Sequence, residues 1–358
     1  MSHRIKAAIA AAVAVLVVVP ASASAATKDV NMGIPPSAAK PFRPTNADVN
    51  AFFPSSTTIH VGDSVRFLAV GFHNLDLPKK GGKPTALIAP TGQAIAGVAD
   101  AAGAAFWFNG QQNLQFNLPA LAPVGFGKKF TYTGAKGVQS GLPLVNKPKP
   151  VTVKFAKTGS FTYYCDIHSG MKATVKVVAK SKSVPSAKAD ATRVKDQVAK
   201  ALAVAKAAPK TKPPAGVIDV GVAGKGGVEY FGMVPAKSTV PVGTTLTFRM
   251  SPGTYDDHTA TFGPGDPEKE PTSYLGKISK SFEGATLDQT GVYPSEAPGT
   301  TATLVPTLHG NGFWNSGVMD GSSATPLPSS SKVTFGAPGT YNFLCLIHPF
   351  MKGTVVVQ

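Results

Sequence analysis

Apolar and polar residues alternate on both sides of each of the two cysteines in the chain. The alternation covers four short ranges: 160–165, 173–177, 340–345 and 355–357. A period of two is typical of β-strands with one buried face. Cys165 and Cys345 stand on the apolar side at the ends of their strands, so the pattern predicts that each thiol points into a core. After each cysteine we expect a short loop and then the last strand of that half.

The same pattern occurs twice because the chain repeats itself. Residues 159–172 correspond to residues 339–352, and residues 54–67 correspond to residues 235–248. A repeat of this length indicates a duplicated domain, and 358 residues are enough for two domains. The 37 Gly and 31 Pro that punctuate short Val, Thr and Phe runs are typical of an all-β protein with many turns.

We therefore predict two all-β domains, residues 27–179 and 216–358, joined by a linker of different composition. Residues 180–215 are rich in Ala and Lys and have almost no aromatic residues. Their apolar residues recur with the spacing of one helix face, at Val194, Val198, Leu202 and Ala205. This pattern predicts a helix that rests on a domain, and a freely solvated spacer is the alternative.

The N-terminus has the parts of a secretory signal. Arg4 and Lys6 precede an apolar run over 7–19, and small residues follow over 21–26. This run is short for a membrane span, which takes about 20 residues. We expect residues 1–26 to be a signal peptide, with the mature protein exported to the periplasm or the cell exterior.

The chain is strongly basic, with 35 Lys and Arg against 19 Asp and Glu, a formal net charge of +16. Such a charge favours acidic partner proteins or an anionic envelope surface. Nucleic acid is not expected as a partner, because export argues against it and no aromatic-plus-basic motif supports it. The oligomeric state is left open.

Each cysteine begins a Cys-x2-His-x2-Met motif, formed by Cys165, His168 and Met171 and by Cys345, His348 and Met351. A thiolate, two imidazoles and a weak axial thioether are the ligands of a blue-copper site. Each loop supplies three ligands, so the second imidazole must come from elsewhere. The candidates are His73 and His258, which follow corresponding strands of the repeat. Structural zinc rarely takes Met, and two cysteines in separate cores cannot easily form a disulfide.

Both halves resemble cupredoxins, the group of plastocyanin, azurin and amicyanin. The second loop and the strand after it, residues 345–357, are similar to those of amicyanin-like proteins, and the first loop has the same ligand spacing. The resemblance implies Greek-key β-sandwiches, one type 1 copper per domain, and single-electron transfer. It also implies that Asn74 braces the first copper loop, a position where the second half has Thr259. Both halves carry long insertions, residues 77–110 and 264–298, whose role the sequence leaves open.

Two other functions compete with an electron carrier. Copper storage or delivery is the alternative, although the Met-rich or His-rich tracts that mark it are absent. A copper nitrite reductase or multicopper oxidase would need a His beside the copper Cys and His-x-His pairs. Tyr164 and Leu344 precede the cysteines instead, so no enzymatic activity is expected. The two remaining histidines of the predicted domains, His60 and His309, are expected to be ordinary surface or loop residues.

The second domain is expected to present the main electron port to partners. Pro349 and Phe350 lie beside His348, whereas Ser169 and Gly170 lie beside His168. Small apolar patches suit short-lived redox complexes, so the second loop is the better docking surface.

Overall fold

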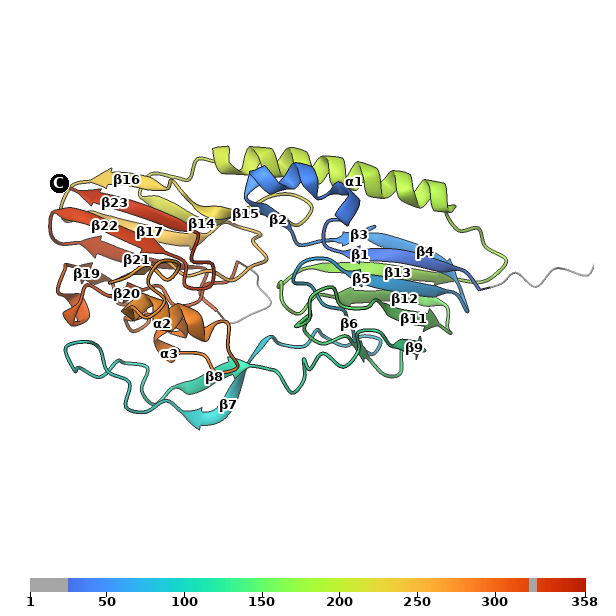
Figure 1. The fold of residues 1–358 in the computed structure, drawn as a ribbon, viewed down its shortest axis with the longest axis horizontal. Coiled ribbons are helices and arrows are strands. Elements are labelled where there is room, and N and C mark those ends of the chain that lie inside the picture. The colour runs from blue at the N-terminus through green and yellow to red at the C-terminus, as the bar shows by residue number, and fades with distance from the viewer. Residues whose placement is uncertain (1–24, 322–326) are drawn as a thin grey trace, which may run out of the picture.

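A computed structural model describes residues 25–321 and 327–358. Most of the predicted signal peptide, residues 1–24, lies outside the described part of the chain. The described residues form two β-sandwiches side by side, with one long helix lying across both (Figure 1). The predicted fold class, two all-β units joined by a partly helical linker, is confirmed. Within these residues no helix has the length and apolar character needed to cross a membrane.

The first sandwich has two five-stranded sheets. One has the order β3 (Phe52–Phe53), β1 (Thr27–Met32), β5 (Ser64–Ala69), β11 (Val151–Phe155) and β9 (Lys129–Tyr132). The other has the order β10 (Val138–Gln139), β6 (Asp76–Leu77), β12 (Gly159–Tyr164), β13 (Lys172–Val178) and β4 (Ser56–His60). The predicted alternation is confirmed here, because Phe161, Tyr163 and Val175 are buried between the sheets while Ser160 and Thr162 face solvent.

The second sandwich repeats this plan. One sheet has the order β19 (Ala302–Leu304), β21 (Ser330–Phe335), β17 (Thr245–Met250), β14 (Val217–Ala223), β15 (Val228–Val234) and β2 (Ala47–Val49). The other has the order β16 (Lys237–Val240), β23 (Lys352–Val357), β22 (Gly339–Leu344), β18 (Thr261–Phe262) and β20 (Trp314–Asn315). Cys165 and Cys345 are both free and buried, each just after its strand.

Strand β2 belongs in sequence to the first half but pairs with the second sandwich. It runs antiparallel to β15, with Asp48 opposite Glu229 and Val49 opposite Val228. The next residue, Asn50, donates its backbone N–H to the carbonyl of Gly227 at 2.7 Å. The first half therefore completes the edge of the second half's sheet, so the two sandwiches share main-chain hydrogen bonds.

The predicted linker helix is α1 (Ala187–Ala207). Its Ser186 side chain accepts a hydrogen bond from Ala189 N, which caps the first turn. The apolar face of α1 packs in one cluster with Phe53 of the first half and Val228 of the second. The helix therefore rests on both halves rather than serving as a free spacer. Four short 3-10 helices complete the connections: η1 (Pro36–Ala38), η2 (Lys40–Thr45), η3 (Ala208–Lys210) and η4 (Leu308–Gly310).

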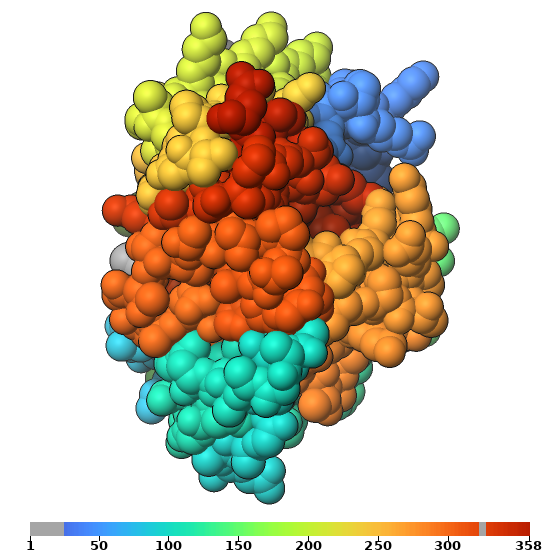
Figure 2. All heavy atoms as spheres, turned by 90° about the vertical axis from the view of Figure 1, so that its left-hand side faces the viewer, coloured from blue at the N-terminus to red at the C-terminus, as the bar shows by residue number. Residues whose placement is uncertain are grey.

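The two long insertions pack against each other. The first contains the two-stranded sheet of β7 (Ile88–Ala94) and β8 (Gln112–Phe116), and the second contains α2 (Tyr274–Ser281) and α3 (Gln289–Val292). Phe106 and Phe108 of the first insertion share a buried cluster with Leu275 and Ile278 of the second. Figure 2 shows the first insertion, in turquoise, lying directly against the orange segments of the second half. The insertions thus form a third contact between the halves.

Candidate metal centres

Three predicted ligands of the first half meet at one end of the first sandwich. The Sγ of Cys165 lies 3.5 Å from Nδ1 of His168 and 3.9 Å from Nδ1 of His73. The two Nδ1 atoms are 2.9 Å apart. Cys165, which follows β12, and His168 come from one loop, whereas His73 comes from the turn after β5. Met171, the fourth predicted ligand, is 1% exposed and packs in the same core cluster as Cys165.

Main-chain hydrogen bonds close the loop that carries these residues. Cys165 N donates to the carbonyl of Met171 at 3.1 Å, and Met171 N donates to the carbonyl of His168 at 3.0 Å. Gly33, which follows β1, lies behind the His73 ring. A Cβ at Gly33 would approach Cδ2 of His73 to 2.8 Å, and its φ of +100° also favours glycine.

Asn74 holds the loop to the turn that carries His73. Its Oδ1 accepts the backbone N–H of Asp166 at 2.7 Å, and its Nδ2 donates to the Asp166 carboxyl at 2.7 Å. Burial, and then the nearby Asp76 carboxyl, raise the pKa of Asp166 to about 8. The brace that the sequence suggested at Asn74 is therefore present as a hydrogen bond, directly beside Cys165.

The second half brings together the equivalent residues. The Sγ of Cys345 lies 3.8 Å from Nδ1 of His258 and 3.9 Å from Nδ1 of His348, and the two Nδ1 atoms are 3.1 Å apart. Met351 is 1% exposed, and its carbonyl accepts the N–H of Cys345 at 3.0 Å. Gly221 of β14 lies behind the His258 ring as Gly33 does behind His73, because a Cβ there would reach 2.7 Å from Nε2.

Thr259 fills the bracing position in the second half. Its Oγ1 accepts the backbone N–H of Leu346 at 2.8 Å, the same bond that Asn74 makes to Asp166. Its own N–H donates to the Sγ of Cys345 at 3.3 Å. The hydroxyl of a Thr can thus replace the amide of an Asn here, since only one acceptor oxygen is required.

The electrostatics of the second site favour a thiolate beside imidazole. Burial alone would raise the pKa of the Cys345 thiol, but hydrogen bonds to His258 and His348 hold it well below its usual range. Burial lowers the pKa of His73 strongly, which keeps that ring neutral and able to bind a metal through nitrogen. Although burial opposes it, the carboxylates and thiolates beside His168 and His258 raise the pKa of both rings.

The donor sets fit copper. Each site offers one thiol sulfur and two imidazole nitrogens that face one another, with a buried Met thioether in the same core, and all of these side chains except the half-buried His348 are buried. Sulfur, two imidazoles and a thioether select copper over harder ions, and the absence of a fourth strong ligand disfavours structural zinc.

No family model matches the chain. A curated relative, amicyanin-alpha of Methylorubrum extorquens, is 65% identical over 26 residues, which are 7% of this chain. The match spans only 22% of the length of that relative.

Among solved structures, amicyanin of Paracoccus versutus matches with a TM-score of 0.22 and 16% identity, over 42% of this chain and 89% of that one. The oxidised plastocyanin of Dryopteris crassirhizoma matches with a TM-score of 0.20 and 20% identity, over 40% of this chain and 99% of that one. The predicted resemblance to amicyanin is confirmed by the 26-residue match to the curated relative. What the two sites can do follows from their own geometry.

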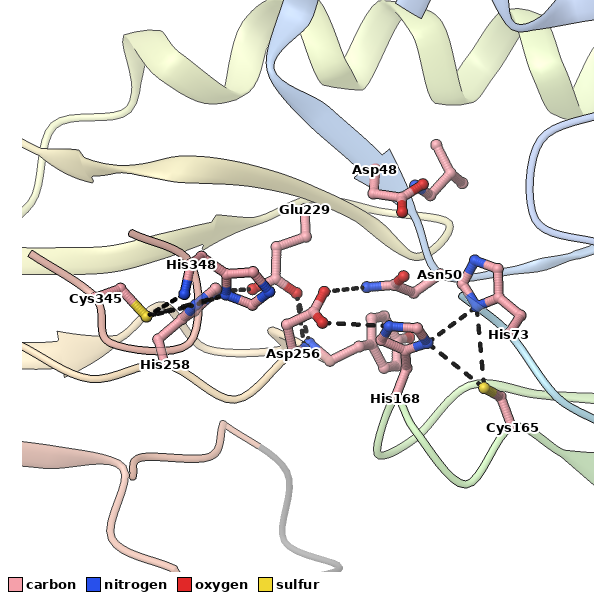
Figure 3. Close-up of polar contacts among 12 residues, drawn as sticks. Asp48, Asn50, His73, Cys165, His168, Glu229, Asp256, His258, Cys345 and His348 are labelled. Atoms are coloured by element: carbon pink, nitrogen blue, oxygen red, sulfur yellow. Dashed lines mark hydrogen bonds and ion pairs between the residues drawn. The ribbon is translucent and has the colours of Figure 1, made fainter. Parts of the chain in front are cut away.

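The sequence missed the residues that lie between the two sites. Nε2 of His168 lies 3.2 Å from the carboxylate of Asp256, a residue of the second half. Nε2 of His258 lies 2.9 Å from the carboxylate of Glu229 on β15. Figure 3 shows both carboxylates between the two Cys–His groups. Nothing in the sequence signalled this arrangement, because it depends on how the two sandwiches dock.

The two remaining histidines of the described chain lie away from both sites. His60 is half-buried at the end of β4, and its Nε2 lies 2.7 Å from the carbonyl of Lys182. His309 is not the isolated loop residue that the sequence suggested. Its two ring nitrogens lie 3.0 Å from Asp100 and 2.9 Å from Glu296, so it joins the two insertions.

Proposed function

We propose that the protein is an exported tandem cupredoxin that carries single electrons through one type 1 copper in each domain. The observation that carries the proposal is the duplicated group of one Cys and two His, with a buried Met in the same core. The first ion would be held by His73, Cys165, His168 and Met171, and the second by His258, Cys345, His348 and Met351. Bound copper would supply a couple between Cu(II) and Cu(I).

The protein around each group is suited to fast electron exchange. Asn74 and Thr259 fix the spacing between the first His and the Cys loop, and main-chain hydrogen bonds close each loop. A ligand set held in one arrangement needs little rearrangement when the charge on the ion changes. This rigidity favours an electron carrier over a storage or delivery protein, because the release of copper requires the ligand residues to move apart.

An enzyme of the nitrite reductase or oxidase type is not supported. The residues before the cysteines are Tyr164 and Leu344, and only two groups of three or more metal-binding side chains lie in the described part of the chain. Purified, fully loaded protein with a reductant should therefore consume neither oxygen nor nitrite steadily.

Copper loading tests the proposal. The mature protein should bind two copper ions and show an intense blue charge-transfer band when oxidised. Cys165→Ala should remove one ion and about half of the band, and Cys345→Ala should remove the other half. A single copper per chain, or the loss of both ions with one substitution, would contradict two independent sites. Rapid mixing with a reductant and an oxidised partner separates a carrier from a storage protein, which would not cycle.

The partners are proposed to be acidic redox proteins, because the chain carries a formal net charge of +16. Positive charge would speed the encounter with an acidic protein, and added salt would weaken this effect.

A further inference from the structure

The loop histidines of the two sites have different surroundings. His348 is half-buried, and beside it Phe350 is 49% exposed. His168 is 5% exposed, although it occupies the equivalent position in the first loop. The outer nitrogen of His168, which would otherwise face solvent, lies against the carboxylate of Asp256.

The second half forms the cap over His168. Asp256 is itself buried, and its other carboxylate oxygen accepts a hydrogen bond from Asn50 at 2.8 Å. The ring of Tyr255 lies so close to the first loop that a Cβ at Gly170 would come within 2.8 Å of it. A partner protein cannot approach His168 along this side without displacing the second half.

The residue that covers His168, Asp256, is also connected to the second site by hydrogen bonds. The backbone N–H of Asp256 donates to Oε2 of Glu229 at 3.1 Å, and the other oxygen of Glu229 lies 2.9 Å from Nε2 of His258. Glu229 is 0% exposed, so this segment of the path lies beneath the surface. Asp256 is also only two residues before His258 in the chain. The path from His168 to His258 therefore consists of hydrogen bonds and covalent bonds (Figure 3).

We propose that the first site has no electron port of its own and exchanges electrons only with the second site, through Asp256 and Glu229. This inference rests on the proposed copper-carrying function. In the step, one electron passes from copper(I) at one site, which becomes copper(II), to copper(II) at the other, which becomes copper(I). No covalent bond forms or breaks, and no proton is transferred. Asp256 and Glu229 are positioning residues, and partner proteins dock only at the second loop.

The cap can be tested without copper. Copper-free protein is treated with diethyl pyrocarbonate, and the modified histidines are identified by peptide mass spectrometry. His348 should be modified while His168 remains protected, and Asp256→Ala should expose His168. Modification of His168 at the rate of His348 in the unsubstituted protein would overturn the cap. Because this measurement needs no copper, it separates failure of the cap from failure of the copper function.

The order of electron flow is tested with single-site variants and ferrous cytochrome b5, an acidic protein reductant. In Cys165→Ala, the second site should be reduced at its normal rate. In Cys345→Ala, the first site should be reduced at least about ten-fold more slowly than in the unsubstituted protein. The reason is that the second site, through which its electrons would pass, then holds no copper. If the first site in Cys345→Ala is reduced as fast as before, it has its own port and the proposal is wrong.

The bridge is tested by following electron redistribution between the sites after pulsed reduction. Asp256→Ala should slow redistribution roughly ten-fold, and Asp256→Asn should restore most of the rate, because its side-chain oxygen can still contact His168. Asp48→Asn is the matched control. Asp48, on β2, has a carboxylate near His168, but this carboxylate is not part of the path from His168 to His258. Blue bands from both sites verify folding. An unchanged rate in Asp256→Ala, or an equal loss in Asp48→Asn, would overturn the bridge.

Discussion

At the residue scale, aromatic side chains distinguish the second loop from the first. The ring of Phe231, on β15, lies 5.0 Å from the ring of His348 and 6.0 Å from that of Phe350. The sequence indicated Phe350 but not Phe231, because β15 approaches the loop only in the folded protein. Together these rings form a small apolar surface beside the loop histidine, as the proposed port requires.

Phe350→Glu should slow electron exchange with an acidic partner while both copper bands remain. An aromatic contact at a docking centre contributes about 1–2 kcal/mol, which corresponds to roughly ten-fold in affinity. The rate is measured by stopped flow at low and high salt.

The matched control is Phe72→Glu, which introduces the same charge beside the first site. Phe72 is 51% exposed and adjoins His73. Gly170 cannot serve as the control, because its φ of +95° and its contact with Tyr255 would make any side chain disruptive. If Phe72→Glu slows exchange as much as Phe350→Glu, the port has been assigned to the wrong half.

At the element scale, the structure shows what the two insertions do, a role that the sequence left open. Trp107 donates its indole N–H to the carbonyl of Pro294 at 2.8 Å, and Phe108 stacks on Tyr293 with 5.5 Å between ring centroids. Leu344 and Leu346, which flank Cys345, belong to the same buried cluster as Phe108. The insertions therefore support the second site from behind as well as joining the halves.

Removing the Phe108 ring should destabilise the protein. Phe108 is 0% exposed, and Phe108→Ala leaves a cavity that costs about 3–5 kcal/mol of unfolding free energy. Denaturant titration measures the loss. Val145→Ala is the control, because Val145 is 59% exposed and its truncation should change stability by less than about 0.5 kcal/mol. Equal effects of the two substitutions would show that the insertions do not contribute to the stability of the fold.

His309 should make the contact between the insertions dependent on pH. Hydrogen bonds to Glu296 and Asp100 raise the pKa of His309, so folding favours the protonated ring. Its stabilising contribution is complete below the unfolded pKa of about 6.5 and is lost as the pH rises through the higher folded pKa.

His309→Asn tests this, because Asn tolerates the φ of 50° found at this position. The difference in melting temperature between the unsubstituted protein and the variant should be largest near pH 5.5 and smaller near pH 8.5, both approximate values. A difference that grows as the pH rises would contradict a protonated His309.

At the scale of the whole molecule, three further contacts tie the sandwiches together in addition to the contact of Asp256 with His168. They are the pairing of β2 with β15, the packing of α1 on both halves, and the cluster between the insertions. Domains joined by shared buried clusters and by a shared sheet are expected to unfold together, unlike domains on a flexible tether.

Copper-free protein should therefore show one cooperative thermal transition. Calorimetry checks this through the agreement of the calorimetric and van't Hoff enthalpies. Residues 216–358 expressed alone should be less stable, because β15 loses its partner strand and Val228, 0% exposed in the whole chain, loses its cover. Two well-separated transitions, or an isolated second half as stable as the whole chain, would show that the sandwiches are independent.

Features that depend on neighbours along the chain are predictable from the sequence alone. Alternation around Cys165 and Cys345 predicts two strands and their buried faces, because side chains on a strand alternate with period two. The spacing from Cys to His to Met places three candidate ligands in each loop. The internal repeat then indicates His73 and His258 as the fourth ligands, because they follow corresponding strands. The spacing of the apolar residues Val194 and Val198 likewise predicts a helix with one apolar face.

The position of one site relative to the other is visible only in the folded molecule. Asp256 contacts His168 across the junction of the two sandwiches, whose docking includes the pairing of β2 with β15. Glu229 contacts His258 because β15 folds beside the turn that carries that histidine. Such contacts join residues far apart in the chain, and no periodic pattern records them. For the same reason the sequence alone predicts an ordinary loop residue at His309. Motifs local in the sequence supply most of the residues of each site. The packing of one sandwich on the other leaves the loop of His348 accessible and covers the loop of His168.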